Sequence, residues 1–138
     1  MILKDGEIIE NSHIGVFYLG MSKKQIFSLL DLNYEKERQK NVVRIGNIAF
    51  WFNSREEVFQ IGVTKGFQGK FRGVIGIGST LEDVKKNAGN FVYAYDVYEP
   101  ENISGICFEL EDVDDWEELT APIEWIYVYS LKYFHVND

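Results

Sequence analysis

The sequence contains two similar segments that lie 58 residues apart. The segment "GVFYLGMSKKQIFSLL", which begins at Gly15, aligns without a gap with "GVIGIGSTLEDVKKNA", which begins at Gly73. The matching pairs are Gly15 with Gly73, Val16 with Val74, Leu19 with Ile77, Gly20 with Gly78, Ser22 with Thr80 and Ile26 with Val84. The same register continues into "NIAFWFN" and "GICFELE". Self-similarity at a fixed offset indicates two copies of one supersecondary unit that share a core.

Each copy predicts a sharp corner followed by a helix. Gly20 and Gly78 stand where a residue without a Cβ lets the backbone turn sharply. Ser22 and Thr80 follow as N-caps, because a hydroxyl can accept a hydrogen bond from a free amide of the first helical turn. The second copy also resembles a phosphate-binding loop, with Ser79 in place of the lysine. Since the first copy has no phosphate pattern, we interpret both segments as structural corners rather than nucleotide sites.

After each helix the apolar period changes from about 3.6 to about 2, which is typical of strands. The predicted strands are 42–45, 47–53 and 57–64 in the first unit, and 91–98, 103–111 and 123–133 in the second. An acidic loop, "EDVDDWEELTAP", separates the last two, and a small hairpin is predicted around Asp5–Gly6.

These elements predict an α+β fold in a single domain, residues 1–138. The domain is made of two structural repeats, at about 11–68 and 69–133. Each repeat is a helix-plus-antiparallel-meander unit. We expect the two tandem units to form one continuous antiparallel sheet with the helices packed on one face.

The tandem corners, each opening a helix and followed by antiparallel strands, resemble the β-lactamase inhibitor protein family. The resemblance covers the chain from about Gly15 to Tyr129. It implies two tandem units whose concave face grips a partner protein. The units are shorter here, and the two-cysteine arrangement expected within each unit of that secreted family is absent. The resemblance therefore implies the fold and a protein-binding role, but not a lactamase target.

The single cysteine, Cys107, agrees with a reducing compartment, because no internal disulfide can form. No apolar run approaches the roughly 18 residues that span a bilayer. Lys4 and Asp5 interrupt the N-terminus before a signal-peptide core could form. We therefore predict a cytoplasmic protein with no membrane partner. Small, acidic, cysteine-poor proteins of this kind resemble the bacterial immunity proteins, which neutralise toxins that are often basic nucleases.

The acidic residues are concentrated in the second half of the chain. Residues 1–86 carry 13 basic and 10 acidic side chains, whereas residues 87–131 carry 11 acidic side chains and no Lys or Arg. A surface of one sign repels nucleic acid and accelerates association with a partner of the opposite sign. The one basic stretch, "YEKERQKNVVR", is interrupted by glutamates and predicts a solvated loop. We expect a basic protein partner, such as a toxin domain, and no nucleic acid.

Alternation along the strands predicts which side chains share a face of the sheet. Aromatic side chains of 91–98 and 123–133 would project from the face opposite the helices, together with Cys107 and alternate acids of 103–111. Tyr and Trp supply large contact area at low entropic cost, and acids around them steer the choice of partner. The predicted partner-binding residues are Trp51, Tyr93, Tyr95, Glu109, Glu111, Asp112, Asp114, Asp115, Trp116, Glu117, Glu118, Trp125, Tyr127 and Tyr129. For any single aromatic, packing within the protein is the alternative role.

No catalytic, metal-binding or cofactor-binding residue is predicted. Cys107 would need a base, and the two histidines, His13 and His135, lie in no recognisable motif. The acids of 109–118 lack the central glycine and the regular oxygen spacing of a calcium loop. We therefore expect a stoichiometric protein inhibitor rather than an enzyme. The alternatives are a small-ligand or lipid-type binding module, a homodimer, or an enzyme that uses Cys107 or a carboxylate pair.

Overall fold

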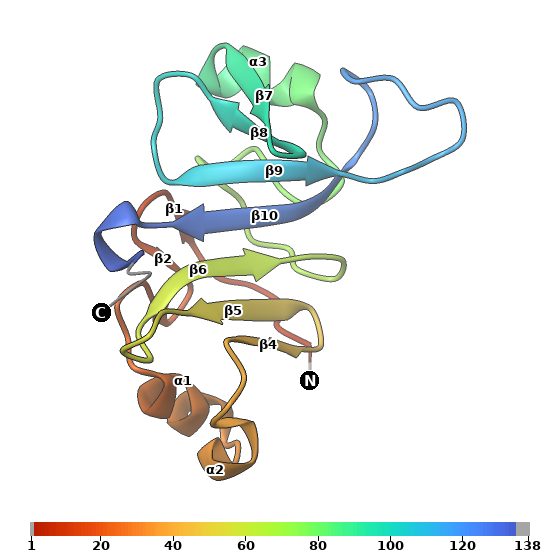
Figure 1. Ribbon diagram of the computed structural model, residues 1–138. Coiled ribbons are helices and arrows are strands. Elements are labelled where there is room, and N and C mark those ends of the chain that lie inside the picture. The colour runs from red at the N-terminus through yellow and green to blue at the C-terminus, as the bar shows by residue number, and fades with distance from the viewer. Residues whose placement is uncertain (1, 135–138) are drawn as a thin grey trace.

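The structure, a computed structural model, describes residues 2–134 and combines two antiparallel sheets with short helices (Figure 1). The small sheet comprises β1 (Ile8–Ile9), β2 (His13–Ile14) and β3 (Phe17–Tyr18). The large sheet comprises β4 (Val42–Ile45), β5 (Ile48–Phe52), β6 (Val58–Val63), β7 (Phe91–Ala94), β8 (Val97–Pro100), β9 (Ile106–Leu110) and β10 (Ile123–Tyr129). The helices are α1 (Lys23–Leu30), α2 (Tyr34–Glu37), α3 (Leu81–Ala88) and the 3-10 turn η1 (Leu131–Tyr133). The predicted α+β class is confirmed. None of the helices within residues 2–134 has the length and apolar character needed to cross a membrane.

The large sheet joins strands from both halves of the chain in the order β4-β5-β6-β10-β9-β8-β7. Its two central strands, β6 and β10, are antiparallel, with Ile61 opposite Val128 and Val63 opposite Ile126. The other neighbouring strands are antiparallel as well. The strands predicted for the two halves therefore lie in one sheet, while β1, β2 and β3 form a second sheet that the sequence did not predict.

The two glycine corners and the helices after them form as expected. Gly20 and Gly78 have φ angles of 92° and 91°, in a region that strongly favours glycine. At both helix starts a hydroxyl, of Ser22 or Thr80, accepts the backbone N–H of the third helical residue. The side chain of that third residue in turn accepts the backbone N–H of the cap, which completes a capping box in each helix. The local signals at the corners and N-caps were therefore sufficient to place α1 and α3.

One face of the large sheet packs against the helices and forms the core. Its buried side chains are Ile48, Phe50, Ile61, Val63, Ile106, Phe108, Ile126 and Val128. Ile26 and Phe27 of α1 and Leu81 and Val84 of α3 belong to the same buried cluster. Both helices therefore lie on one side of the sheet, and the opposite side of the sheet faces away from this core.

Several local predictions are wrong. The strand predicted over 123–133 is shorter, because β10 ends at Tyr129 and η1 follows it. Residues 91–98 do not form one strand, because Tyr95 and Asp96, with φ angles of 53° and 67°, turn the chain between β7 and β8. Two successive residues with positive φ make the tight turn that joins antiparallel strands. The N-terminal hairpin also turns elsewhere: β1 pairs with β2, and Asn11, at φ 56°, lies in the turn in place of Asp5–Gly6.

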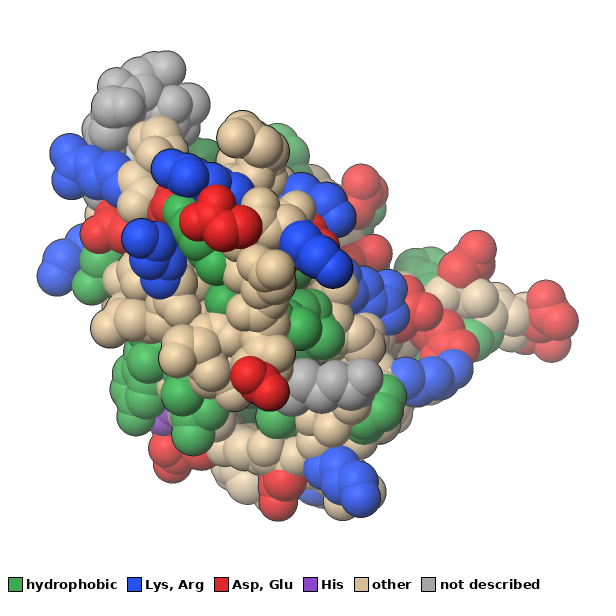
Figure 2. All heavy atoms as spheres, turned by 90° about the horizontal axis from the view of Figure 1, so that it is seen from below, with side chains coloured by type: hydrophobic (Ala, Val, Ile, Leu, Met, Phe, Trp, Pro, Cys, Tyr) green, Lys and Arg blue, Asp and Glu red, His purple; other side chains and the backbone are tan. Residues whose placement is uncertain are grey.

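Charge is distributed unevenly over the surface. Figure 2 views the molecule from below, where Lys and Arg side chains are numerous over the body of the protein. The segment between β9 and β10 projects at the right of Figures 1 and 2, and all of its charged side chains are acidic. We call this segment, residues 111–122, the acidic loop.

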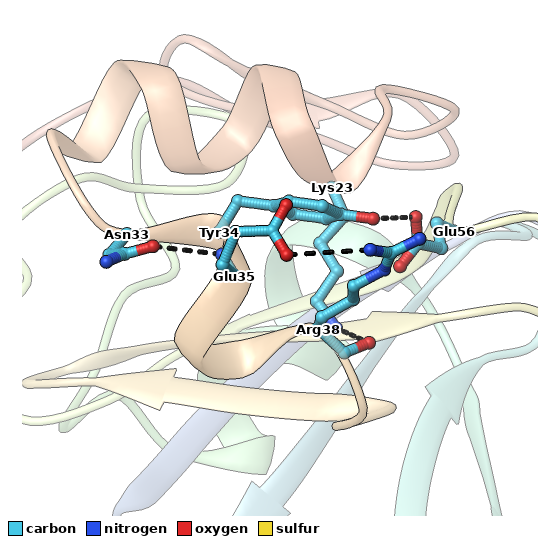
Figure 3. A network of polar contacts seen from close by, with 6 residues as sticks. All are labelled: Lys23, Asn33, Tyr34, Glu35, Arg38 and Glu56. Atoms are coloured by element: carbon cyan, nitrogen blue, oxygen red, sulfur yellow. Dashed lines mark hydrogen bonds and ion pairs between the residues drawn. The ribbon is translucent and has the colours of Figure 1, made fainter.

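The stretch that was predicted as a solvated loop contains α2 and is anchored by a buried lysine. Lys23 is 1% exposed, and its Nζ donates a hydrogen bond to the carbonyl oxygen of Arg38, at 3.1 Å (Figure 3). The same Nζ donates to the carbonyl oxygen of Lys40, at 2.5 Å. The hydroxyl of Tyr34 donates to Glu56, as Figure 3 also shows. The Lys23 bonds attach the segment between α2 and β4 to the first turn of α1, and the Tyr34 bond attaches α2 to the turn between β5 and β6.

Candidate protein-binding face

The side of the large sheet that points away from the helices carries a group of aromatic side chains. We call it the aromatic face, and it consists of Trp51, Trp125, Tyr127 and Tyr129, together with Glu99, Cys107 and Glu109. Ile126 and Val128 point into the core, so the alternate residues of β10 point the other way. Tyr127 lies opposite Cys107 on β9 and opposite Gly62 on β6. The expected grouping of Trp51 with the aromatics of β10 is therefore present.

The aromatic rings pack against one another across neighbouring strands. The ring centroids of Trp51 and Tyr127 are 5.6 Å apart in an edge arrangement, and those of Trp125 and Tyr127 are 5.7 Å apart and stacked. Gly62 makes room for this packing, because a Cβ there would lie 2.7 Å from Cδ1 of Tyr127. Arg44 of β4 extends the group, with its guanidinium carbon 5.0 Å from the ring centroid of Trp125. Tyr127 is the centre of the face and is 9% exposed.

Two tyrosine–glutamate hydrogen bonds hold the face in place. The hydroxyl of Tyr127 donates to Oε1 of Glu109, and the hydroxyl of Tyr129 donates to Oε1 of Glu99, each at 2.5 Å. Burial, and then these hydrogen bonds to carboxylates, raise the pKa of both tyrosines above the ordinary value of 10.0. Both phenols are therefore neutral donors at neutral pH, and their rings are fixed before any ligand arrives.

A pocket of about 390 Å³ opens on the aromatic face. Its lining residues are Trp51, Gln60, Tyr95, Val97, Glu99, Cys107, Tyr127 and Tyr129. The lining of the pocket therefore combines the side chains of four aromatic residues with one carboxylate, that of Glu99. Tyr95, in the β7–β8 turn, is 97% exposed and stands at the edge of the pocket.

The environment of Cys107 does not favour a nucleophile. The residue is 6% exposed, and burial, followed by the charges of Glu99 and Glu109, raises the pKa of the thiol to about 12. A thiol with that pKa is protonated at neutral pH, whereas the reactive form is the thiolate. The Nε2 of His13 donates to Glu7, its Nδ1 is hydrogen-bonded to Ser12, and its ring stacks on Tyr18. The other candidate base, His135, lies outside the described residues.

No group of His, Cys, Asp and Glu among residues 2–134 has the arrangement of a metal site. Apart from Glu111, the acids of the acidic loop are exposed. Within residues 2–134 the aromatic face, with its pocket, is the candidate binding site.

Tyr93 lies on the wrong side of the sheet for the predicted face. It pairs with Tyr98, which pairs in turn with the buried Phe108, so all three residues point to the helix side. The ring centroids of Tyr93 and Tyr98 are 4.8 Å apart, and the Tyr93 hydroxyl donates to Asp96. The error follows from the single strand predicted over 91–98, because the turn at Tyr95 resets the alternation.

The acidic loop lies at the end of the sheet rather than around the aromatic rings. Glu111 follows the end of β9 and forms an ion pair with Lys65, at 3.5 Å. Glu118 accepts a hydrogen bond from Tyr98, on the helix side of the sheet. Trp116 is 46% exposed. The other predicted loop acids, Asp112, Asp114, Asp115 and Glu117, are exposed. Of the predicted acids, only Glu109 belongs to the aromatic face, so an acidic surround made by this loop is not observed.

Sequence reasoning missed Glu99, Gln60 and Gly62 as parts of the face. Glu99 was missed because the predicted strand ends at residue 98, whereas β8 continues to Pro100. Gly62 gave a usable signal, since a glycine inside a strand often marks the close approach of another group. Gln60 carries no such signal, and its place follows only from its register opposite Trp51 and Tyr129.

The chain was compared with protein-family models, with curated proteins and with solved structures, and none of the three comparisons gave a match.

Proposed function

We propose that this protein binds a protein partner through the aromatic face and acts as a stoichiometric inhibitor of that partner. The observation that carries the proposal is the aromatic face itself. Trp51, Trp125 and Tyr129 keep part of their surface accessible, while hydrogen bonds and ring packing hold the group in one arrangement. Aromatic anchors that are ordered before binding lose little entropy on association, which is a property of protein-binding hot spots.

We also propose that the chain is a tandem of two related units, as the sequence repeat indicates. Two reciprocal backbone hydrogen bonds support this. In the first unit the N–H of Gly20 donates to the carbonyl of Val58, at 2.8 Å, and the N–H of Val58 donates to the carbonyl of Met21, at 2.9 Å. In the second, Gly78 and Ser79 make the same two bonds with Ile123, at 2.9 and 2.7 Å.

These bonds attach each glycine corner to the first residue of the last strand in its unit, β6 or β10. The helices α1 and α3, and the strands β5 and β9, also start 58 residues apart. The sheet order supports the same division, because β6 and β10 meet at the centre while β5 and β9 flank them. The aromatic face would then span both units, with Trp51 from the first and the β10 aromatics from the second.

The charge of the second half favours a basic partner. Residues 87–131 contain no Lys or Arg, and the acidic loop projects into solvent beside the sheet. Such a loop can attract a basic protein from a distance, and the aromatic face can then supply contact area. These properties support a cytoplasmic immunity protein that neutralises a basic, nuclease-type toxin, and we propose that class of function.

The rival functions have weaker support. The hollow between α2 and β4, of about 310 Å³, is lined by Asp31, Lys36, Glu37, Lys40 and Arg44 among others, which does not favour a lipid. An enzyme that uses Cys107 would need a thiolate, and burial disfavours the thiolate because it raises the pKa of the thiol. Homodimerisation through the aromatic face is a competing use of the same surface, and sedimentation equilibrium distinguishes it from binding to another protein.

The proposal is tested by capturing proteins from the source cell with the immobilised protein. Trp51→Ala removes one anchor of the aromatic face, and Tyr93→Ala removes an exposed aromatic from the opposite face as a matched control. We expect a specific protein to be captured by the wild type and by Tyr93→Ala, but not by Trp51→Ala. The purified partner should then lose its activity at one molar equivalent. Equal capture by the wild type and Trp51→Ala would refute binding through this face.

A further inference from the structure

The pocket on the aromatic face contains the carboxylate of Glu99, for which residues 2–134 provide no cationic partner. Glu99 accepts a hydrogen bond from Tyr129 through Oε1, but no ion pair recorded between residues 2–134 includes Glu99 or Glu109. A hydroxyl hydrogen bond leaves the negative charge of the carboxylate in place. The two charges are partly shielded from solvent, with Cys107 between them on the sheet. A cation that entered the pocket would therefore meet a negative potential.

The other walls of the pocket are aromatic. Trp51, Tyr95, Tyr127 and Tyr129 line it, and each ring has a negatively polarised face that attracts a cation. Rings alone would accept an apolar group equally well. The combination of several rings with one uncompensated carboxylate favours a group that is flat, apolar on its faces and positively charged.

The protein already shows this kind of contact next to the pocket. Arg44 lies over Trp125, which stacks on Tyr127, and Tyr127 lines the pocket. The Nε of Arg44 donates to the carbonyl of Gly46, and this hydrogen bond holds the guanidinium at the edge of the face. The aromatic face thus accepts a guanidinium at one end, while the end that contains Glu99 has no cation from the described chain.

We propose that the pocket around Glu99 receives an arginine side chain of the protein partner. This inference rests on the proposed function, because it names the group of the partner that the aromatic face recognises. A guanidinium can stack on an aromatic ring and donate two parallel hydrogen bonds to a carboxylate, whereas the ammonium of lysine is a compact and strongly hydrated charge. Oε2 of Glu99 is the acceptor that the Tyr129 hydroxyl leaves unoccupied.

The inference is tested without the partner by titration of the whole protein with N-acetyl-arginine methylamide. The neutral control is N-acetyl-citrulline methylamide, which has the same shape without the charge. The chain has three tryptophans, so the indole N–H signals in a ¹⁵N-labelled sample report on the aromatic face through Trp51 and Trp125 and on the acidic loop through Trp116. Trp51→Phe assigns the first signal. We expect the arginine probe to move the Trp51 signal to saturation, and to leave the Trp116 signal in place.

A matched pair of variants locates the site. Glu99→Gln removes the charge and keeps an oxygen that can accept from Tyr129, whereas Glu101→Gln removes the same charge at an exposed turn position next to β8. We expect about tenfold weaker binding of the arginine probe by Glu99→Gln and unchanged binding by Glu101→Gln. Equal melting temperatures establish that both variants are folded. Equal binding of the citrulline probe, or unchanged affinity in Glu99→Gln, would overturn the inference.

The outcomes separate this inference from the proposed function. If Trp51→Ala abolishes capture of a protein but the arginine probe does not move the Trp51 signal, the arginine pocket is refuted and the protein-binding role stands. If the arginine probe saturates the pocket but capture does not depend on Trp51, the pocket binds a guanidinium group, but binding of a partner through this face is refuted, and with it the assignment of the pocket to a partner's arginine.

Discussion

The hydroxyl of Tyr127 on β10 donates a hydrogen bond of 2.5 Å to the carboxylate of Glu109 on β9. The ring of Tyr127 lies over Gly62 of β6 and between the rings of Trp51 and Trp125. One side chain therefore links strands from both halves of the chain on the face that we propose binds a partner. The hydrogen bond of Tyr127, the space that its ring occupies beside Gly62 and the raised pKa of its hydroxyl each lead to a testable prediction.

Tyr127→Phe should destabilise the protein, because it removes the donor and leaves the partly buried Glu109 carboxylate without it. We expect a loss of about 1–3 kcal/mol in the free energy of unfolding, measured by urea denaturation. Tyr93→Phe is the matched control, since Tyr93 also donates to a carboxylate but is 58% exposed. The control should change the stability by no more than about 0.5 kcal/mol. Equal effects of the two variants would contradict the role assigned to Tyr127.

Gly62→Ala should destabilise the sheet, because the new Cβ would lie 2.7 Å from Cδ1 and 2.9 Å from Cε1 of Tyr127. Both atoms belong to a ring that is held by its own hydrogen bond, so relief requires a shift of the ring. We expect a loss of about 1–3 kcal/mol in the free energy of unfolding. In the background of Tyr127→Val, whose side chain leaves room for a methyl group, the same change should have a smaller effect. Additive effects in this double-mutant cycle would show that the two residues do not compete for space.

The stability of the protein should fall with rising pH above about 10. Burial and carboxylate hydrogen bonds raise the pKa of Tyr127 and Tyr129 above 10.0, so above pH 10 the unfolded chain releases these protons before the folded chain does. The unfolded state then binds fewer protons, and the free energy of unfolding decreases as pH rises. Below pH 10 both states hold the protons, and this contribution is fully present.

The measurement is the melting temperature from pH 8 to pH 11, with tyrosine ionisation followed by absorbance. We expect a steeper decline in the wild type than in the double variant with Tyr127→Phe and Tyr129→Phe. Cys107 contributes in the same direction, because burial raises the pKa of its thiol from 9.0 to about 12, and Cys107→Ser in both proteins removes that contribution. A decline of the same slope in both proteins would refute the link to these tyrosines.

Lys23→Met should destabilise the protein although it replaces a charged residue with an apolar one of similar length. The Lys23 side chain donates to the carbonyl oxygens of Arg38 and Lys40, and the variant leaves both without this donor. We expect a loss of about 1–3 kcal/mol in the free energy of unfolding. Lys24→Met is the matched control at the next, exposed position and should be nearly neutral. A neutral Lys23→Met would show that the segment after α2 does not depend on this anchor.

The sequence alone was sufficient wherever the physical cause is local. Gly20 and Gly78 predicted the corners, because positive φ favours a residue without a Cβ, and Ser22 and Thr80 predicted the helix starts, because a cap bonds within its own turn. Strand alternation also placed Trp51 and the aromatics of β10 on one face, since neighbours along a strand always point to opposite sides.

The tertiary structure decided what depends on residues far apart in the chain. Tyr93 lies on the helix side because the turn at Tyr95 and Asp96 resets the alternation. Glu99 lines the pocket because β8 continues past the end of the predicted strand and pairs with β9. By residue type, Lys23 would be expected on the surface of an amphipathic helix. In the structure it is buried, because the segment after α2 packs over it and accepts its hydrogen bonds. The pairing of β6 with β10 assembles the aromatic face from both halves. Alternation within one strand carries no information about which strand will lie beside it, so only the folded sheet determines this face.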